Sequence, residues 1–139
     1  MLMLMLVSVL VMLAATGLML WTYKAASQGT LKRNSTSGIK TQAVMASDET
    51  WVYIHRRFSW IFMAAAGFCA LGVVDLVAGL VAGFITAGDV HGPVGWSVLG
   101  VFILVVLVLD DLIGGGLAAD KTARAYNADH MITPDHHFI

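Results

Sequence analysis

The sequence predicts an all-α integral membrane bundle of three transmembrane helices, with the N-terminus outside the cell and the C-terminus inside. Of its 139 residues, 58% are hydrophobic and only 12% are charged, whereas soluble domains carry about 45–50% apolar and about 25% charged residues. The apolar residues gather in three stretches, each long enough to cross a bilayer. All eight Lys and Arg residues lie between the first two stretches or after the third, which sets the predicted orientation.

The first predicted transmembrane helix covers residues 1–23. Residues 1–20 contain no charge, and a helix of that length, rising about 1.5 Å per residue, spans a hydrocarbon core of roughly 30 Å. Trp21 and Tyr23 follow where an aromatic belt is expected, and Lys24 ends the segment. The alternative is a cleaved signal peptide, which carries basic residues before a shorter apolar run. No basic residue precedes this one, so an uncleaved helix is favoured.

Residues 24–57 are predicted to form a cytoplasmic loop followed by an amphipathic helix. The middle of this range is rich in Ser, Thr, Gly and Asn, which is typical of a loop. Ser47 is a good N-cap, and Asp48 and Glu49 place negative charge at the positive end of a helix. Because no Pro or Gly occurs from Asp48 to Ala66, we expect this helix to continue without a break into the second apolar stretch.

The rest of the chain predicts a transmembrane hairpin and a polar tail. The second transmembrane helix is expected at residues 58–88, an external turn at 89–93, the third transmembrane helix at 94–118 and a cytoplasmic tail at 119–139. Three crossings put the tail on the same side as the basic loop before the hairpin. Both regions are basic and the turn is not, so the positive-inside rule places both in the cytoplasm.

Three carboxylates lie within the last two apolar stretches. Asp75 is the most notable, because a carboxylate inside a membrane is costly and is a functional candidate by default. Two interpretations of Asp75 stay open: an interfacial, structural residue, or a site for a proton or a partner. Asp110 and Asp111 point about 100° apart on a helix and do not converge on one ligand. We expect both near the inner boundary, in a cap or a salt bridge with Lys121 or Arg124.

Other patterns predict packing and argue against catalysis. Gly72, Gly79 and Gly83 form a small-residue stripe that favours close helix packing. The sequence shows no nucleophile–base constellation, phosphate-binding loop or dinucleotide fingerprint, so no catalytic site and no cofactor are predicted. The Asp and His residues of the tail match no standard zinc spacing, so no metal site is predicted. A net charge of −1 gives no case for nucleic-acid binding.

One segment resembles the SdpI-like family of small bacterial membrane proteins. The family pattern is close to G-[IY]-[RK]-T, then several residues, then S-[DN]-E-x-W-x-x-x-[HN]-[RK], just ahead of an apolar hairpin. The matching residues here are Gly38, Ile39, Lys40, Thr41, Ser47, Asp48, Glu49, Trp51, His55 and Arg56. Lys40 stands where Arg is common, and the charge is kept. The resemblance spans about residues 30–110 and leaves the tail uncovered.

The resemblance implies a membrane-bound immunity or signalling role in the bacterial plasma membrane. The best-known member protects its producer against a secreted killing peptide and sequesters a transcription repressor at the membrane. Membrane lipids and other membrane protein chains are the implied partners. The residues implied to bind a partner or a lipid head group are Gly38, Lys40, Thr41, Ser47, Asp48, Glu49, Trp51, His55 and Arg56.

We expect Trp51, His55 and Arg56 in particular to form part of a functional surface at the inner interface. The alternative is structural: a capped helix with an interfacial Trp. Two other functions stay open, an accessory subunit of a larger respiratory or envelope complex, and a small proton-coupled transporter that uses Asp75.

Overall fold

The computed structural model describes residues 2–33, 36–86 and 91–133, and all regular structure in these ranges is helical. The helices are α1 (Leu2–Gln28), the short 3-10 helix η1 (Val44–Ala46), α2 (Asp48–Arg57), α3 (Ser59–Ile85) and α4 (His91–Asp129). Three of them, α1, α3 and α4, are long and apolar enough to cross a membrane. The predicted all-α class is therefore confirmed, as is the presence of three apolar helices long enough to cross a membrane.

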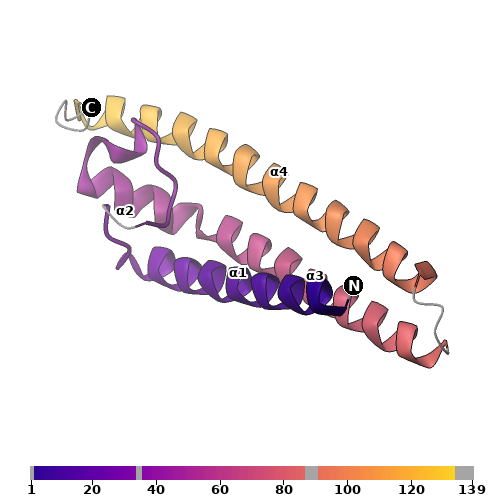
Figure 1. Ribbon diagram of the computed structural model, residues 1–139. Coiled ribbons are helices and arrows are strands. Elements are labelled where there is room, and N and C mark those ends of the chain that lie inside the picture. The colour runs from indigo at the N-terminus through magenta and orange to yellow at the C-terminus, as the bar shows by residue number, and fades with distance from the viewer. Residues whose placement is uncertain (1, 34–35, 87–90, 134–139) are drawn as a thin grey trace.

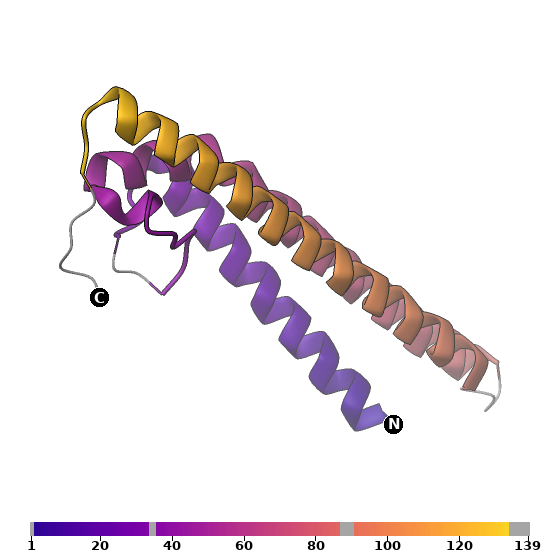
Figure 2. The same cartoon turned by 90° about the horizontal axis from the view of Figure 1, so that it is seen from above.

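The three long helices form an open layer with α3 in the middle. Helices α1 and α4 both pack along α3, and no close backbone approach joins α1 to α4 within the described ranges. Figure 2 shows α1 diverging from the α3–α4 pair towards its N-terminus. Large apolar side chains on α1 and α4 are exposed along their length, as expected where lipid covers them.

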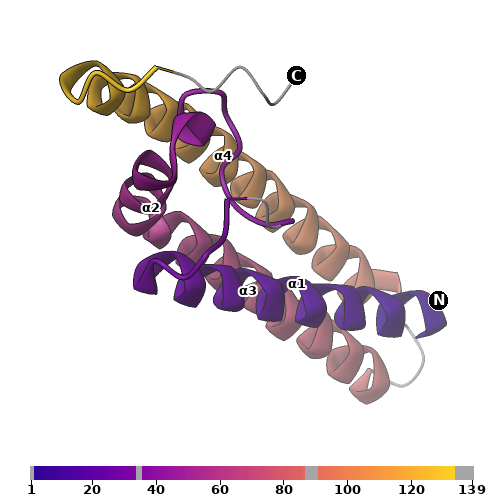
Figure 3. The same ribbon diagram turned by 90° about the vertical axis from the view of Figure 1, so that its left-hand side faces the viewer.

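The remaining elements gather at one end of this layer (Figure 1). The last turns of α1, residues 29–33 and 36–57, and the last turns of α4 pack together there, as Figure 3 shows, and we call this unit the head. Its buried core takes residues from each of these segments. All eight Lys and Arg residues belong to the head, so the two basic regions lie at the same end of the molecule.

The amphipathic helix and the second membrane helix are not continuous, and this expectation was wrong. Phe58 separates α2 from α3 with φ −104° and ψ 14°. The Ser59 hydroxyl donates to the Arg56 carbonyl over 3.1 Å, and such side-chain bonds compete with the helical ladder. The Ile61 N–H donates to the Phe58 carbonyl over 3.1 Å. A hydrogen bond between residues three apart is typical of the tighter 3-10 helix. Phe58 itself is buried in the core of the head, so the packing of its side chain stabilises the interruption between α2 and α3.

Helix α4 continues past residue 118, where the third membrane helix was expected to end, and reaches Asp129. Ala119 and Ala123 are fully buried in the head, and this packing explains why polar residues 119–129 are helical. The Arg124 Nε pairs with Asp120 at 2.8 Å on the same helix.

Other expectations for the hairpin are corrected or lie beyond the described ranges. The salt bridge expected for Asp110 or Asp111 is absent among the described residues. Ten residues of helix, about 15 Å, separate Asp111 from Lys121, which explains the absence. At its start, α4 takes in residues 91–93 of the expected turn, while residues 89–90 and 134–139 lie outside the described ranges.

Close contact between α3 and α4 depends on glycine. A Cβ atom on Gly115 would clash with Cδ1 and Cγ1 of Ile61, and Ile61 is fully buried. On α3, Gly72, Gly79 and Gly83 are buried. A Cβ atom on Gly72 would meet Met12 of α1 at 3.6 Å and Leu104 of α4 at 3.8 Å, so Gly72 lies where both neighbours approach α3.

We predict that Gly115→Ala destabilises the protein by about 1–3 kcal/mol relative to Gly114→Ala, because overpacking a tight contact costs that much. Gly114 is the matched control, since a Cβ atom there meets nothing within 4 Å. Both substitutions gain the same helix propensity, so their difference isolates the contact with Ile61. Unfolding in detergent micelles measures this difference, and equal stability of the two variants contradicts the described packing.

Candidate functional site

The Trp and His of the family pattern lie inside the head. Trp51 and His55 are four residues apart on α2, and their rings stack with centroids 3.9 Å apart and planes tilted by 34°. Each residue is only 1% exposed. Neither can therefore present a surface to a partner, and the expected functional surface of Trp51, His55 and Arg56 is corrected to a buried pair with Arg56 alone exposed.

Both ring nitrogens of His55 are used by the backbone. Its Nε2 accepts the Ile39 N–H over 2.9 Å, and its Nδ1 lies 2.8 Å from the Trp51 carbonyl oxygen, to which Nδ1–H donates. This pair of bonds requires a neutral ring with its proton on Nδ1. Burial lowers the pKa of His55 below its ordinary value, and the bond to the Trp51 carbonyl opposes this only in part.

Gly38 allows the loop to pass over these rings. Its φ is +116°, a conformation that side chains rarely adopt. A Cβ atom on Gly38 would lie 2.7 Å from His55 Nε2 and 3.0 Å from Trp51 Cη2. We call Gly38, Ile39, Trp51 and His55 the motif core, since these four residues fasten the loop onto α2.

Two further bonds hold α2 in place. The Trp51 indole N–H donates to the Leu31 carbonyl over 2.7 Å, which ties α2 to the start of the loop. Ser47 caps α2 as predicted, because its hydroxyl accepts the Thr50 N–H over 3.0 Å. Asp48 and Glu49 occupy the first turn of the helix. The cap therefore starts α2 at the point that brings Trp51 and His55 under the loop.

Asn127 joins α4 to both the loop and α2, and sequence reasoning missed it. Its side-chain nitrogen donates to the Ala43 carbonyl over 2.8 Å, and its oxygen accepts the Thr50 hydroxyl. Asn127 is 7% exposed and Thr50 is fully buried. No local pattern marks these partners, since 77 and 84 residues separate them from Asn127.

The other residues of the family pattern make contacts at the edge of the head. Lys40 is exposed, and Thr41 hydrogen-bonds the Asp120 carboxylate. Asp48 pairs with Arg33 at 3.0 Å. The structure therefore uses most of the pattern to build the head. Besides the exposed Lys40, two members remain, and these two, Glu49 and Arg56, reach an outer surface of α2.

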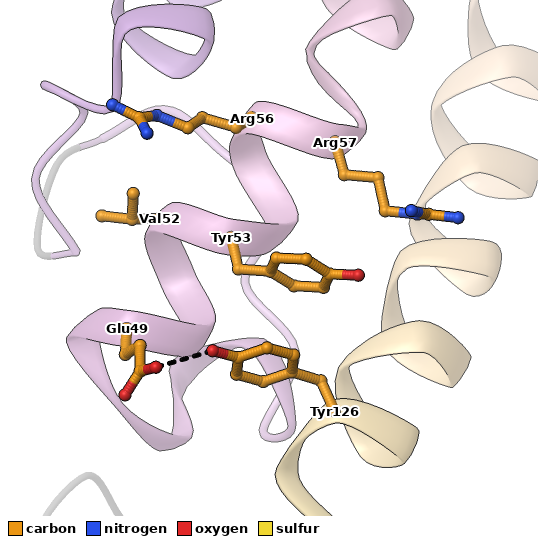
Figure 4. A pocket seen from close by; sticks show the side chains of 6 residues that line it. All are labelled: Glu49, Val52, Tyr53, Arg56, Arg57 and Tyr126. Atoms are coloured by element: carbon orange, nitrogen blue, oxygen red, sulfur yellow. Dashed lines mark hydrogen bonds between the residues drawn. The ribbon is translucent and has the colours of Figure 1, made fainter. Parts of the chain in front are cut away.

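That surface is a groove of about 600 Å³ between α2 and the end of α4. Its lining residues are Glu49, Val52, Tyr53, Arg56, Arg57 and Tyr126 (Figure 4). We call it the α2–α4 groove. Only Glu49 and Arg56 were expected in a site. Val52, Tyr53 and Arg57 were missed because they are not part of the family pattern. Tyr126 was missed because it belongs to the helical extension of α4, which the polar sequence did not predict.

Aromatic rings and two arginines shape the α2–α4 groove. The rings of Tyr53 and Tyr126 stack with centroids 4.3 Å apart, and the Tyr126 hydroxyl donates to Glu49 over 2.7 Å. Arg56 donates to the Gln28 carbonyl over 3.1 Å, whereas Arg57 makes no hydrogen bond or ion pair with any described residue. Figure 4 shows the two arginines extending to opposite sides of the tyrosines.

The composition of the α2–α4 groove favours binding of a protein. No group of three or more His, Cys, Asp or Glu side chains able to hold a metal ion occurs within the described ranges. The His55 ring uses both of its nitrogens for hydrogen bonds to backbone groups. An exposed groove with a stacked tyrosine pair, and with an Arg57 that pairs with no described residue, has the composition of a protein-binding surface, where Tyr and Arg are enriched.

The neutral His55 predicts a pH dependence of stability. Because the folded state lowers its pKa, its contribution is complete above the unfolded value of about 6.5 and is lost as the pH falls below it. Protonation sets an N–H of the ring against the Ile39 N–H, and leaving a buried donor unpaired costs about 1–3 kcal/mol. Unfolding free energies measured from pH 8 to pH 5 should therefore fall more steeply for the native protein than for His55→Gln. Parallel pH profiles contradict this.

The comparison with known proteins agrees with the motif. The profile of the SdpI/YfhL protein family matches residues 30–109, which is more than half of the chain and includes the loop, α2, α3 and the first part of α4. No curated protein and no solved structure gave a match. With three apolar helices long enough to cross a membrane and a match over this range, the chain belongs to the SdpI/YfhL family of membrane proteins.

Proposed function

We propose that the protein is a non-catalytic, multi-pass protein of the bacterial plasma membrane that binds a partner protein at its cytoplasmic face, in an immunity or signalling role. The α2–α4 groove is the observation that carries this proposal. Its tyrosines are held by stacking and by the bond to Glu49, so the surface is ordered before a partner arrives. Such preorganisation reduces the entropy cost of binding.

The proposed orientation places the N-terminus outside and the head in the cytoplasm. All eight Lys and Arg residues belong to the head, and the positive-inside rule puts such a region in the cytoplasm. Trp21 and Trp60 are exposed beside the head, and Trp96 is exposed near the opposite end. Exposed tryptophans at two levels are typical of the two membrane interfaces.

The chemistry of the groove fits an acidic segment of a partner. Arg57 has no described protein partner, and its planar guanidinium bonds a carboxylate through two parallel N–H groups. Tyr53 supplies a ring and a hydroxyl beside it (Figure 4). A larger membrane complex that takes this protein as an accessory subunit would use the same groove, so the identity of the bound protein separates that function from an immunity role.

Photo-crosslinking in living cells tests the proposal. A photoreactive residue at Val52, in the groove wall, should give a discrete adduct with one protein. Arg57→Ala should reduce its yield about tenfold or more, as expected for an arginine at the centre of an interface. Lys121→Ala is the charge-matched control, because Lys121 is exposed on α4 and does not line the groove. Equal yields in both variants, at equal expression and thermal stability, contradict the proposal.

A further inference from the structure

Asp75 lies in the α3–α4 contact with a carboxyl oxygen that has no partner. Its Oδ2 is buried and makes no hydrogen bond with any described residue. Across the contact stands Gly100 of α4, where a Cβ atom would lie 2.8 Å from Oδ2 and 3.1 Å from Cγ. The Ser97 hydroxyl donates to the Asp75 backbone carbonyl over 3.2 Å and so does not serve the carboxyl group. The absence of a side chain at Gly100 makes room for the acid.

This carboxyl group lies within the predicted hydrocarbon layer. Fifteen residues of α3, about 22 Å, separate Asp75 from the exposed Trp60, and four residues of α4, about 6 Å, separate its neighbour Gly100 from the exposed Trp96. These two tryptophans then bracket a layer close to the roughly 30 Å thickness of a hydrocarbon core. Asp75 sits in its outer third.

Within the described parts of α1 and α4 that lie near Asp75, no cationic side chain is available to pair with its carboxylate. Residues 2–22 of α1 and 94–109 of α4 contain no Asp, Glu, His, Lys, Arg, Tyr or Cys. On α3 itself the titratable neighbour is Cys69, which lies six residues away. The side chains that pack beside this level of the helix are apolar: Met5, Val9, Met12, Leu76, Leu80 and Val101.

We propose that Asp75 is a proton-binding site within the membrane. An unpaired carboxylate is costly in such surroundings, and uptake of one proton converts it to a neutral carboxylic acid that fits against Gly100. Release of the proton leaves a carboxylate, which must reach water at the nearer, outer end of the α3–α4 pair. The proton-binding site is separate from the α2–α4 groove, and this proposal does not depend on the function proposed for the groove.

Reaction with a carbodiimide tests the site. The protonated carboxyl group adds its O–H across a C=N bond of the reagent, and the adduct rearranges to a stable N-acylurea without another reactant. In vesicles, lipid-soluble dicyclohexylcarbodiimide should modify Asp75, as read from peptide masses, and the yield should fall as the pH rises. A water-soluble carbodiimide should leave Asp75 unmodified. Equal modification by both reagents, or a yield that does not depend on pH, overturns the proposal.

A second measurement decides the case in which the reagent cannot reach the site. The infrared spectrum of the native protein should contain a carboxylic acid C=O band that is missing from Asp75→Asn and that disappears at high pH. No such band overturns the proposal. Gly100→Ala should push the carboxyl group from its contact and change the frequency of this C=O band, whereas Gly114→Ala, with open space around it, should not. An unchanged C=O band in Gly100→Ala contradicts the placement of the acid against α4.

Discussion

The hydrogen bond from the Ile39 N–H to His55 Nε2 is the contact on which the head depends. A buried backbone N–H needs an acceptor, and here the acceptor is a neutral imidazole whose other nitrogen is already bound to α2. The bond fixes the loop across α2 only because Gly38 brings the backbone this close to the rings. With the loop in place, Trp51 can reach Leu31 and the buried face of α2 is closed.

The family pattern therefore divides into an inner and an outer part. The inner residues of the motif core hold the loop, while Glu49 and Arg56 extend from the same helix into the α2–α4 groove. Because α2 packs between η1, α1 and α4, a change in the motif core would also move the groove. The membrane layer contributes differently. Within the described ranges α1 and α4 each pack along α3 without a close backbone approach to each other, and lipid serves as the remaining packing partner.

Local signals in the sequence predicted the membrane helices and the start of α2, but they did not predict how the head is assembled. Apolar stretches and helix caps are both defined by residues that lie close together in the sequence. The three apolar stretches and the Ser47 cap could therefore be predicted. The break at Phe58 depends on the Ser59 hydroxyl and on burial of the ring, and the extension of α4 depends on Ala119 packing in the head. These are tertiary effects that override propensity. The same cause placed Trp51 and His55 inside, where an interfacial position had been expected.

Amide hydrogen exchange at Ile39, followed by NMR in micelles, tests most directly whether a neutral His55 organises the head. This organisation predicts that the Ile39 amide is protected in the native protein and exchanges rapidly in His55→Leu, which fills the space without an acceptor, while the Ile54 amide in the middle of α2 stays protected in both. An Ile39 amide that exchanges rapidly in the native protein, or one that stays protected in His55→Leu, would contradict it.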